Sequence, residues 1–202
     1  MTEEIKKPAY IGSYIRWTYV KKFLPRKEGG ILLDVGSGNM EFKDLAEKKG
    51  YSYCAFDNDS LLMSPRGTVY DIPYEDETFD AVICVDVFEH LKDDSKAMQE
   101  IKRVLKKDGL LLLHIPNRNQ KHVVIDKPPE QHDHERIGYD PVELYTLFYG
   151  WEHHTYYSTF NHFERIAWDI NYAAMHHIPI NPFKILEYEE GINYGWICVA
   201  RK

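Results

Sequence analysis

After residue 30 the chain alternates between two patterns of apolar and polar residues. Short apolar runs, typical of buried strands, occupy residues 31–35, 53–56, 68–70, 79–85, 110–115, 152–157 and 196–200. Apolar residues at a spacing of three or four, typical of amphipathic helices, fall within 42–50, 93–109, 140–150 and 161–174. Such alternation predicts an α/β fold in which a doubly wound, mostly parallel sheet of seven strands lies between two layers of helices.

Local signals mark the ends of several predicted helices. Gly50 and Gly109 stand where two helices are expected to stop. Asp140, Pro141 and Glu143 combine a capping side chain, a proline at the first helical position and a glutamate at the third. These residues therefore predict a helix that starts at this point.

Length and composition are those of one globular domain. The chain has 202 residues, 44% of them hydrophobic and 28% charged, which is enough for a single buried core. We expect one domain over 1–202, made of an N-terminal segment (1–29), a first half (30–116) and a second half (117–202). The N-terminal segment has helical spacing and carries Tyr14 and Trp17. It is expected to pack on the domain or, alternatively, to act as a lid over a substrate.

Charge and apolar content narrow the range of partners. A formal net charge of −7 argues against a nucleic-acid backbone as a main partner. No apolar run approaches the roughly 20 residues needed to span a bilayer, and the N-terminus lacks the apolar core of a signal peptide. Cys54, Cys84 and Cys198 each lie in an apolar run, which is typical of buried core thiols in a reducing compartment. We expect a cytoplasmic protein without a membrane or nucleic-acid partner; its oligomeric state is open.

The turn after the first predicted strand carries the first candidate chemistry. Residues 33–38 read Leu-Asp-Val-Gly-Ser-Gly, in which Gly36 and Gly38 allow the backbone to approach a ligand closely. Asp57 follows the second predicted strand, where a carboxylate can accept hydrogen bonds from both hydroxyls of a ribose. This arrangement predicts a cofactor that contains a nucleoside.

Two features favour S-adenosylmethionine over a dinucleotide. The third glycine of the dinucleotide fingerprint is missing. In addition, Asp34 directly precedes the turn, where its charge would repel a pyrophosphate and attract the ammonium or sulfonium of a methionine group.

From Leu33 to about Pro116 the chain resembles the class I S-adenosylmethionine-dependent methyltransferases, especially those that act on small molecules. The matching motifs occupy 33–38, 56–57, 71–80, 82–91 and 100–109 in the family's order. The resemblance implies a Rossmann-like fold and S-adenosylmethionine as cofactor. Two positions depart from the family pattern: Met40 stands in place of a common glycine, and Thr68 in place of an aspartate that accepts a hydrogen bond from adenine.

The resemblance also implies which residues hold the cofactor. The methionine half would lie against Asp34, Gly36 and Gly38, with Val85 and Asp86 at its edge, and Asp57 would bind the ribose. The full set of predicted cofactor-binding residues is Asp34, Gly36, Ser37, Gly38, Asp57, Asn58, Thr68, Val69, Val85 and Asp86.

The acceptor is expected beyond the carboxyl ends of the strands, where ligands of doubly wound sheets bind. The predicted substrate-binding residues are Tyr14, Trp17, Phe88, Asn117 and Arg136, and the candidate general bases are His90, His132 and His134, with Glu89 weaker. His90 alternatively serves only as a helix-start residue.

The loop at 130–139 is dense in titratable residues and allows three interpretations. It is a solvated surface loop, a loop that recognises the substrate, or part of a metal site. The metal site would use His132, His134 and Glu135 with His90 or His114 as a distant partner. The predicted site includes no metal.

The sequence therefore predicts an enzyme, a transferase that moves a methyl group from S-adenosylmethionine to an unidentified, small-molecule acceptor. A non-catalytic S-adenosylmethionine-binding regulatory or partner protein is the alternative. An NAD-dependent oxidoreductase is disfavoured by Asp34 and the missing glycine.

Overall fold

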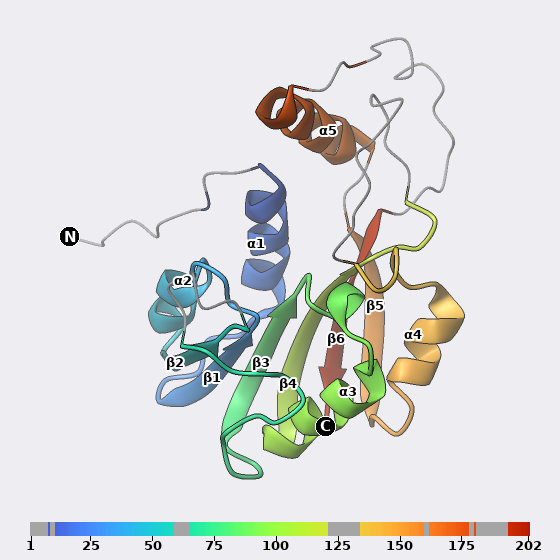
Figure 1. Ribbon diagram of the computed structural model, residues 1–202. Helices are drawn as coiled ribbons and strands as arrows, with labels where there is room; N and C mark the ends of the chain where they lie inside the picture. Colours follow the sequence, from blue (N-terminus) through green and yellow to red (C-terminus); the bar gives the residue numbers. More distant parts are fainter. Residues whose placement is uncertain are drawn as a thin grey trace, which may run out of the picture.

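A central sheet organises the computed structural model, which describes residues 8, 11–58, 65–120, 134–159, 162–177, 180 and 194–202. In this part of the chain the sheet has six strands in the order β2-β1-β3-β4-β6-β5 (Figure 1). The strands are β1 (Gly30–Val35), β2 (Tyr51–Phe56), β3 (Phe79–Val85), β4 (Leu105–Pro116), β5 (His153–Thr159) and β6 (Gly195–Arg201). The α/β class is confirmed, and the sheet is mixed.

The antiparallel part of the sheet is confined to one edge. β1 pairs in parallel with β2 and β3, and β3 with β4, whereas β6 runs antiparallel to both β4 and β5. Thr159, the last residue of β5, is the partner of Gly195, the first residue of β6. The chain thus leaves β5 and enters β6 at the same end of the sheet. β6 therefore runs antiparallel to β5, because a parallel strand would have to start at the opposite end.

One predicted strand is absent from the described part of the chain. Residues 68–70 form no strand of the sheet: Thr68 makes only an isolated bridge to Asp71, and its hydroxyl accepts a 3.3 Å hydrogen bond from the Tyr70 N–H. This run is too short to extend beyond a local turn. The predicted seventh strand is therefore absent here, and the sheet has six.

The predicted end of one helix is also wrong. The helix expected to stop at Gly109 ends at Val104, and β4 already begins at Leu105. Leu105 pairs with Phe79 of β3, and the register shifts between Phe79 and Ala81. Leu105 continues the apolar stripe of the preceding helix, but its pairing with a neighbouring strand prevails, since this pairing satisfies backbone groups in the sheet.

Helices cover both faces of the sheet. They are α1 (Ile11–Phe23), α2 (Lys43–Lys48), η1 (Phe88–His90), α3 (Asp94–Val104), α4 (Pro141–Leu147) and α5 (His162–His176). Leu32 packs in one apolar cluster with α1 and α2, while its neighbour Leu33 packs in the other with α3 and α4. Alternate residues of a strand point to opposite faces, so both faces of β1 are buried. The expected sandwich of helices, sheet and helices is present.

Capping explains where α4 begins. The side chain of Asp140 accepts hydrogen bonds from the Val142 and Glu143 N–H groups, both 2.9 Å, and Glu143 accepts one from the Asp140 N–H. This is the predicted capping box. α4 ends at Leu147, three residues before the predicted Gly150.

The N-terminal helix is present and packs on the domain. Trp17 and Val20 of α1 and Leu24 after it are almost fully buried in the same cluster as β1 and β3. α1 and α5 lie beside each other near the carboxyl ends of the parallel strands (Figure 1). They approach closely at Gly12, where a Cβ would lie 2.5 Å from Nε1 of Trp168.

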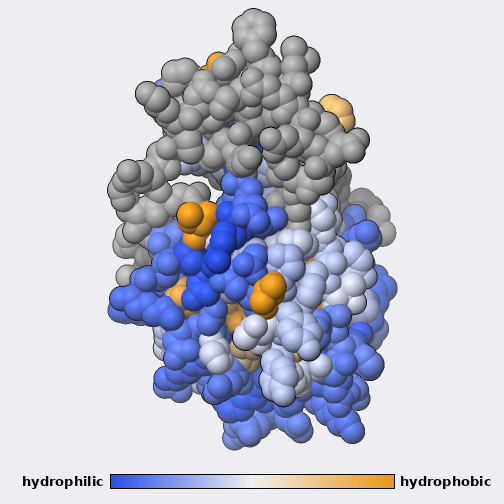
Figure 2. Space-filling view, turned by 90° about the vertical axis from the view of Figure 1, so that its right-hand side faces the viewer, coloured by the Kyte–Doolittle hydropathy of each residue, from blue (hydrophilic) through white to orange (hydrophobic). Residues whose placement is uncertain are grey.

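The surface over α4 is predominantly hydrophilic. Figure 2 shows this face with hydrophobic side chains only in separate spots. The large apolar and aromatic side chains exposed in and around α4 are Ile137, Val142, Tyr145 and Tyr149. None of the helices in the described part of the chain is both long and apolar enough to cross a bilayer.

Asp80 is a buried charge that stabilises the fold in a pH-dependent way. Its carboxylate accepts hydrogen bonds from Lys27 at 2.6 Å, Lys106 at 2.9 Å and the Ile31 N–H at 2.9 Å. Burial alone would raise the pKa of Asp80, but these donors lower it to about 2. We expect Asp80→Asn to lower the free energy of unfolding at pH 7 by about 1–3 kcal/mol, because charge-assisted bonds are lost.

The stability lost in Asp80→Asn depends on pH in a defined range. The folded pKa lies below the ordinary value of 3.8, so the stabilisation is present above about pH 4 and is lost as the pH falls towards 2. Urea denaturation at pH 7 and pH 2.5 measures it, with Asp76→Asn as the control at an exposed carboxylate that pairs with Arg103. A cost that is equal at both pH values contradicts the electrostatic explanation.

Candidate functional site

The glycine turn after β1 is tied to the end of β2 by backbone hydrogen bonds. The Gly36 and Ser37 N–H groups donate to the Phe56 carbonyl at 3.0 and 3.1 Å, and the Gly38 N–H donates to Oδ2 of Asp57 at 2.9 Å. These bonds place the turn and the Asp57 carboxylate at the same edge of the sheet, as the sequence predicts.

The two glycines are needed for different reasons. Gly36 has a φ of 67°, and a Cβ there would lie 2.3 Å from Cγ2 of Val87. Gly38 has a φ of 50°, and its Cβ would meet nothing within 4 Å. Packing within the protein therefore excludes a side chain at Gly36, whereas the space next to Gly38 is open to a ligand.

Met40 also adopts the left-handed conformation, with a φ of 57°. A residue with a Cβ pays roughly 1–2 kcal/mol for this backbone conformation, and glycine does not. Met40 thus adopts a backbone conformation that glycine would adopt at lower cost.

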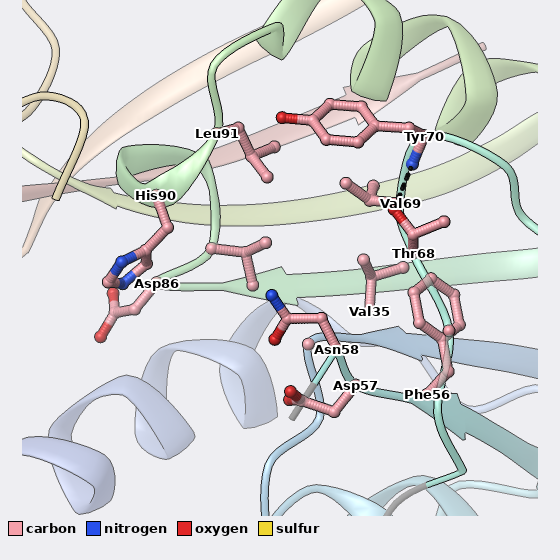
Figure 3. Close-up of a pocket in the computed structure, with 13 residues that line it drawn as sticks. Val35, Phe56, Asp57, Asn58, Thr68, Val69, Tyr70, Asp86, His90 and Leu91 are labelled. Atoms are coloured by element: carbon pink, nitrogen blue, oxygen red, sulfur yellow. Dashed lines mark hydrogen bonds between the residues drawn. The ribbon is translucent and has the colours of Figure 1, made fainter. Parts of the chain in front are cut away.

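A cavity of about 500 Å³ opens beside this turn (Figure 3). Six of the predicted cofactor-binding residues line it: Gly36, Asp57, Asn58, Thr68, Val69 and Asp86. Figure 3 shows Asp57 and Asn58 from the end of β2 on one side, and Asp86 and His90 close together at one end. Ligand pockets span about 300–1,000 Å³, so the cavity has room for a nucleoside.

A second cavity of about 240 Å³ adjoins the first. Gly36 and Asp86 line both cavities. Ser13 and Arg16 of α1 form one wall of the smaller cavity, and Ser37, Gly38 and Val85 contribute to the rest. Of the ten predicted cofactor-binding residues, all but Asp34 therefore line one of the two cavities.

Asp34 instead faces the protein interior. It is only 1% exposed, and its Oδ2 accepts a 2.5 Å hydrogen bond from the Tyr53 hydroxyl. Burial raises the pKa of this carboxyl to about 7, although the Tyr53 hydrogen bond acts in the opposite direction. The structure thus places the Asp34 carboxyl behind the turn and not at a cavity wall.

Asp86 is a carboxylate that lines both cavities. Arg16 pairs with its Oδ2 at 2.5 Å, and Nδ1 of His114 lies 2.6 Å from its Oδ1. Burial alone would raise the pKa of Asp86, but Arg16 and His114 hold it at about 2, so the group is ionised at neutral pH. His114 is held in turn by Thr159, whose hydroxyl lies 3.0 Å from its Nε2.

Arg16 and His114 have roles that the sequence does not reveal. The sequence suggests for His114 only the role of a distant metal ligand, yet the register of β3 and β4 pairs it with Val85, next to Asp86. Arg16 lies in a helix that the spacing predicts, but the spacing does not tell which end of the sheet this helix covers.

The structure brings two of the three predicted catalytic histidines together. The rings of His90 and His134 lie edge to face, with centroids 4.5 Å apart. Two backbone N–H groups next to His134, those of Glu135 and Arg136, donate to the Glu89 carbonyl at 2.9 and 3.1 Å. His132 lies outside the described residues. A catalytic role for these histidines stays a prediction.

Some predicted substrate-binding residues are in the core. Phe88 is fully buried and Trp17 is 1% exposed, so both rings belong to the core in this structure, and a substrate contact for either one stays a prediction. Phe88 follows β3 with its ring in the cluster around α3, and Trp17 points from α1 into the sheet. Burial of large aromatic side chains outweighs their value as contact surface in both cases.

The other predicted substrate-binding residues have structural partners. Asn117 is buried, and its side chain accepts a hydrogen bond from the Asn119 N–H. Arg136 pairs with Asp94 at 2.7 Å and lies over the Tyr139 ring. Tyr14 is 39% exposed and stacks against Trp17.

Comparison with known proteins agrees with this geometry. A family model described as a methyltransferase domain matches residues 12–177. Phosphoethanolamine N-methyltransferase 2 of Haemonchus contortus, solved with S-adenosyl-L-methionine, superposes with a TM-score of 0.68 at 16% identity, over 97% of this chain and 54% of that one.

Two curated relatives match a shorter stretch. An uncharacterized protein of Methanocaldococcus jannaschii is 31% identical over 109 residues, which is 50% of this chain and 46% of the relative. A ubiquinone biosynthesis O-methyltransferase of Alkalilimnicola ehrlichii is 27% identical over 131 residues, 57% of this chain and 53% of the relative. The chain spans about half the length of the curated relatives it matches.

Since the family model covers most of its length, the chain belongs to the methyltransferase-domain family, and its fold is that of the class I S-adenosylmethionine-dependent methyltransferases.

The buried carboxyl of Asp34 leads to a stability prediction. Its folded pKa of about 7 lies above the ordinary 3.8, so ionisation at higher pH costs folding free energy. We expect Asp34→Asn, which keeps an acceptor for Tyr53, to raise the free energy of unfolding at pH 8 by on the order of 2 kcal/mol.

The gain should shrink as the pH falls from 7 towards 4, because only below the ordinary pKa of 3.8 is Asp34 protonated in both the folded and the unfolded chain. Urea denaturation of the ligand-free protein at pH 4.5 and 8 measures the trend. The exposed Asp71, substituted by asparagine, is the control. A loss of stability that is the same at both pH values overturns this assignment of Asp34.

Proposed function

We propose that the chain is an enzyme that transfers a methyl group from S-adenosylmethionine to a small-molecule acceptor. The observation that carries the proposal is the pair of adjoining cavities at the glycine turn, lined by nine of the ten residues predicted to bind the cofactor. Membership in the methyltransferase-domain family supports it independently.

The larger cavity is proposed to hold the adenosine. Asp57 is 7% exposed and lines this cavity, and one of its oxygens already accepts the Gly38 N–H. A carboxylate has about four acceptor sites, so Asp57 retains capacity for the ribose hydroxyls. Thr68 and Val69 line the same cavity and are proposed to contact the adenine.

The smaller cavity is proposed to hold the amino-acid tail of the cofactor. That tail has one ammonium and one carboxylate, and the cavity wall has Asp86 and Arg16 in contact at 2.5 Å. An ion pair of this kind matches a zwitterion, since each ligand charge can meet the opposite protein charge. We therefore propose that Asp86 attracts the cationic group of the cofactor, in place of Asp34, which the sequence predicts for this role.

The acceptor is proposed to approach from the end of the larger cavity where His90 and Asp86 lie. S-adenosylmethionine, when bound, supplies a methyl group on a sulfonium, so the protein needs mainly to align acceptor and methyl carbon. The acidic chain argues against a nucleic-acid acceptor. One related protein is named an O-methyltransferase and another an N-methyltransferase, so the proposal includes both oxygen and nitrogen as the acceptor atom.

Cofactor binding tests the proposal. We expect S-adenosylmethionine to bind the wild-type chain with one site, and Asp57→Asn to weaken binding at least tenfold, about 1.4 kcal/mol. Asparagine keeps an acceptor for the Gly38 N–H but loses a charged acceptor for the ribose. Titration calorimetry is the measurement, with Asp71→Asn as the matched surface control.

Absence of wild-type binding, or equal affinity in Asp57→Asn, contradicts the proposal. A second measurement separates enzyme from binding protein: incubation with methyl-labelled cofactor and a mixture of metabolites. Transfer of label to a small molecule supports the enzyme. Tight binding without transfer to any acceptor favours a regulatory or partner protein.

A further inference from the structure

Three metal-ligating side chains gather beside the larger cavity. They are Glu89 and His90 of η1 and His134 of the segment before α4, and one ligand atom from each lies within 4.8 Å of the others. Forty-four positions separate His90 from His134 in the chain, so tertiary structure alone brings them together.

Backbone contacts hold the two segments in this position. The Glu89 carbonyl accepts both the Glu135 and the Arg136 N–H, which fixes the chain immediately after His134 against η1. Arg136 pairs with Asp94 at 2.7 Å, and the Tyr139 hydroxyl donates to the same carboxylate at 2.9 Å. The three ligand groups are therefore preorganised by contacts that do not use the ligand atoms themselves.

We propose that Glu89, His90 and His134 bind a divalent first-row transition-metal ion such as Zn²⁺. Two imidazoles and one carboxylate are a ligand set typical of these ions, whereas Mg²⁺ and Ca²⁺ favour ligand sets made of oxygen. Ligand bonds of about 2.0–2.2 Å place two donors of a tetrahedral ion about 3.3–3.6 Å apart. The three ligand atoms, which lie within 4.8 Å of one another, therefore have to move closer together when the ion binds.

The ligand set differs from the one considered from the sequence. Glu89 supplies the carboxylate in place of Glu135, and His90 is the distant partner of His134. Glu89 is 2% exposed, so its charge is shielded from solvent and gains strongly from a cation. A nitrogen that coordinates a metal does not accept a proton, which makes His90 and His134 ligands and not general bases.

Three protein ligands leave coordination positions open, as in catalytic metal sites. His90 also lines the larger cavity, next to Asp86. An open position would therefore face the end of the cavity assigned to the acceptor, an inference that rests on the proposed function. Binding of the metal itself does not depend on it.

Metal titration of the full chain tests the site. After treatment with a chelator, Zn²⁺ is titrated by calorimetry, and Co²⁺ is titrated in parallel because its visible absorption reports nitrogen and oxygen coordination. We expect one bound ion per chain and at least tenfold weaker binding in Glu89→Gln, His90→Ala and His134→Ala. His153→Ala, at an exposed position of β5, is the matched control and should bind as the wild type does.

Circular dichroism of each variant shows whether it folds. If an alanine variant does not fold, Glu89→Gln still tests the site, because it keeps the shape of the buried side chain. Failure of the wild type to bind either ion, or equal affinity in the folded variants, overturns the metal site. S-adenosylmethionine is titrated into the same samples. Metal binding without cofactor binding supports the metal site and contradicts the proposed function. Cofactor binding without metal binding supports the proposed function and overturns the metal site.

Discussion

The hydrogen bonds between the glycine turn and the end of β2 are the constraint on which the site depends. Three successive N–H groups, from Gly36 to Gly38, all donate to Phe56 or Asp57. They turn the chain sharply after β1 and hold it against the carboxylate that is proposed to bind the ribose. Without these bonds the two adjoining cavities would lose their common wall at Gly36.

Two aspartates near this turn differ in charge because their surroundings differ. Asp34 is buried with a tyrosine hydroxyl as its partner, and its pKa rises to about 7. Asp86 is paired with a guanidinium and an imidazole, and its pKa falls to about 2. The ion pair at the cavity wall is therefore supplied by the end of β3 and by α1, although the sequence pattern draws attention to the end of β1.

The sequence predicts those parts of the fold and of the site that depend on residues close together in the chain. The glycine turn, Asp57 after β2 and the capping box at Asp140 depend on neighbours close in the chain, and each is present. Leu105 continues the apolar stripe of the helix before it, and only its pairing with Phe79 places it in a strand. The reversal of β6 likewise depends on where the chain enters the sheet.

Contacts between distant segments could not be predicted in the same way. Arg16 meets Asp86 because Trp17 and Val20 bury one side of α1 against the sheet and turn Arg16 towards the cavity. His134 meets His90 through hydrogen bonds to the Glu89 carbonyl, a backbone atom without any sequence signature. Aromatic residues near the site, such as Phe88, resemble substrate contacts in the sequence but are part of the core.

The central claim is that the zwitterionic tail of the cofactor lies against the Arg16–Asp86 ion pair while its ribose lies on Asp57. A crystal structure of the chain with S-adenosylhomocysteine tests this claim most directly. The account predicts ribose hydroxyls within hydrogen-bond distance of the Asp57 carboxylate and the ligand ammonium at Asp86. A ligand bound outside these cavities, or with its ammonium at Asp34, would contradict it.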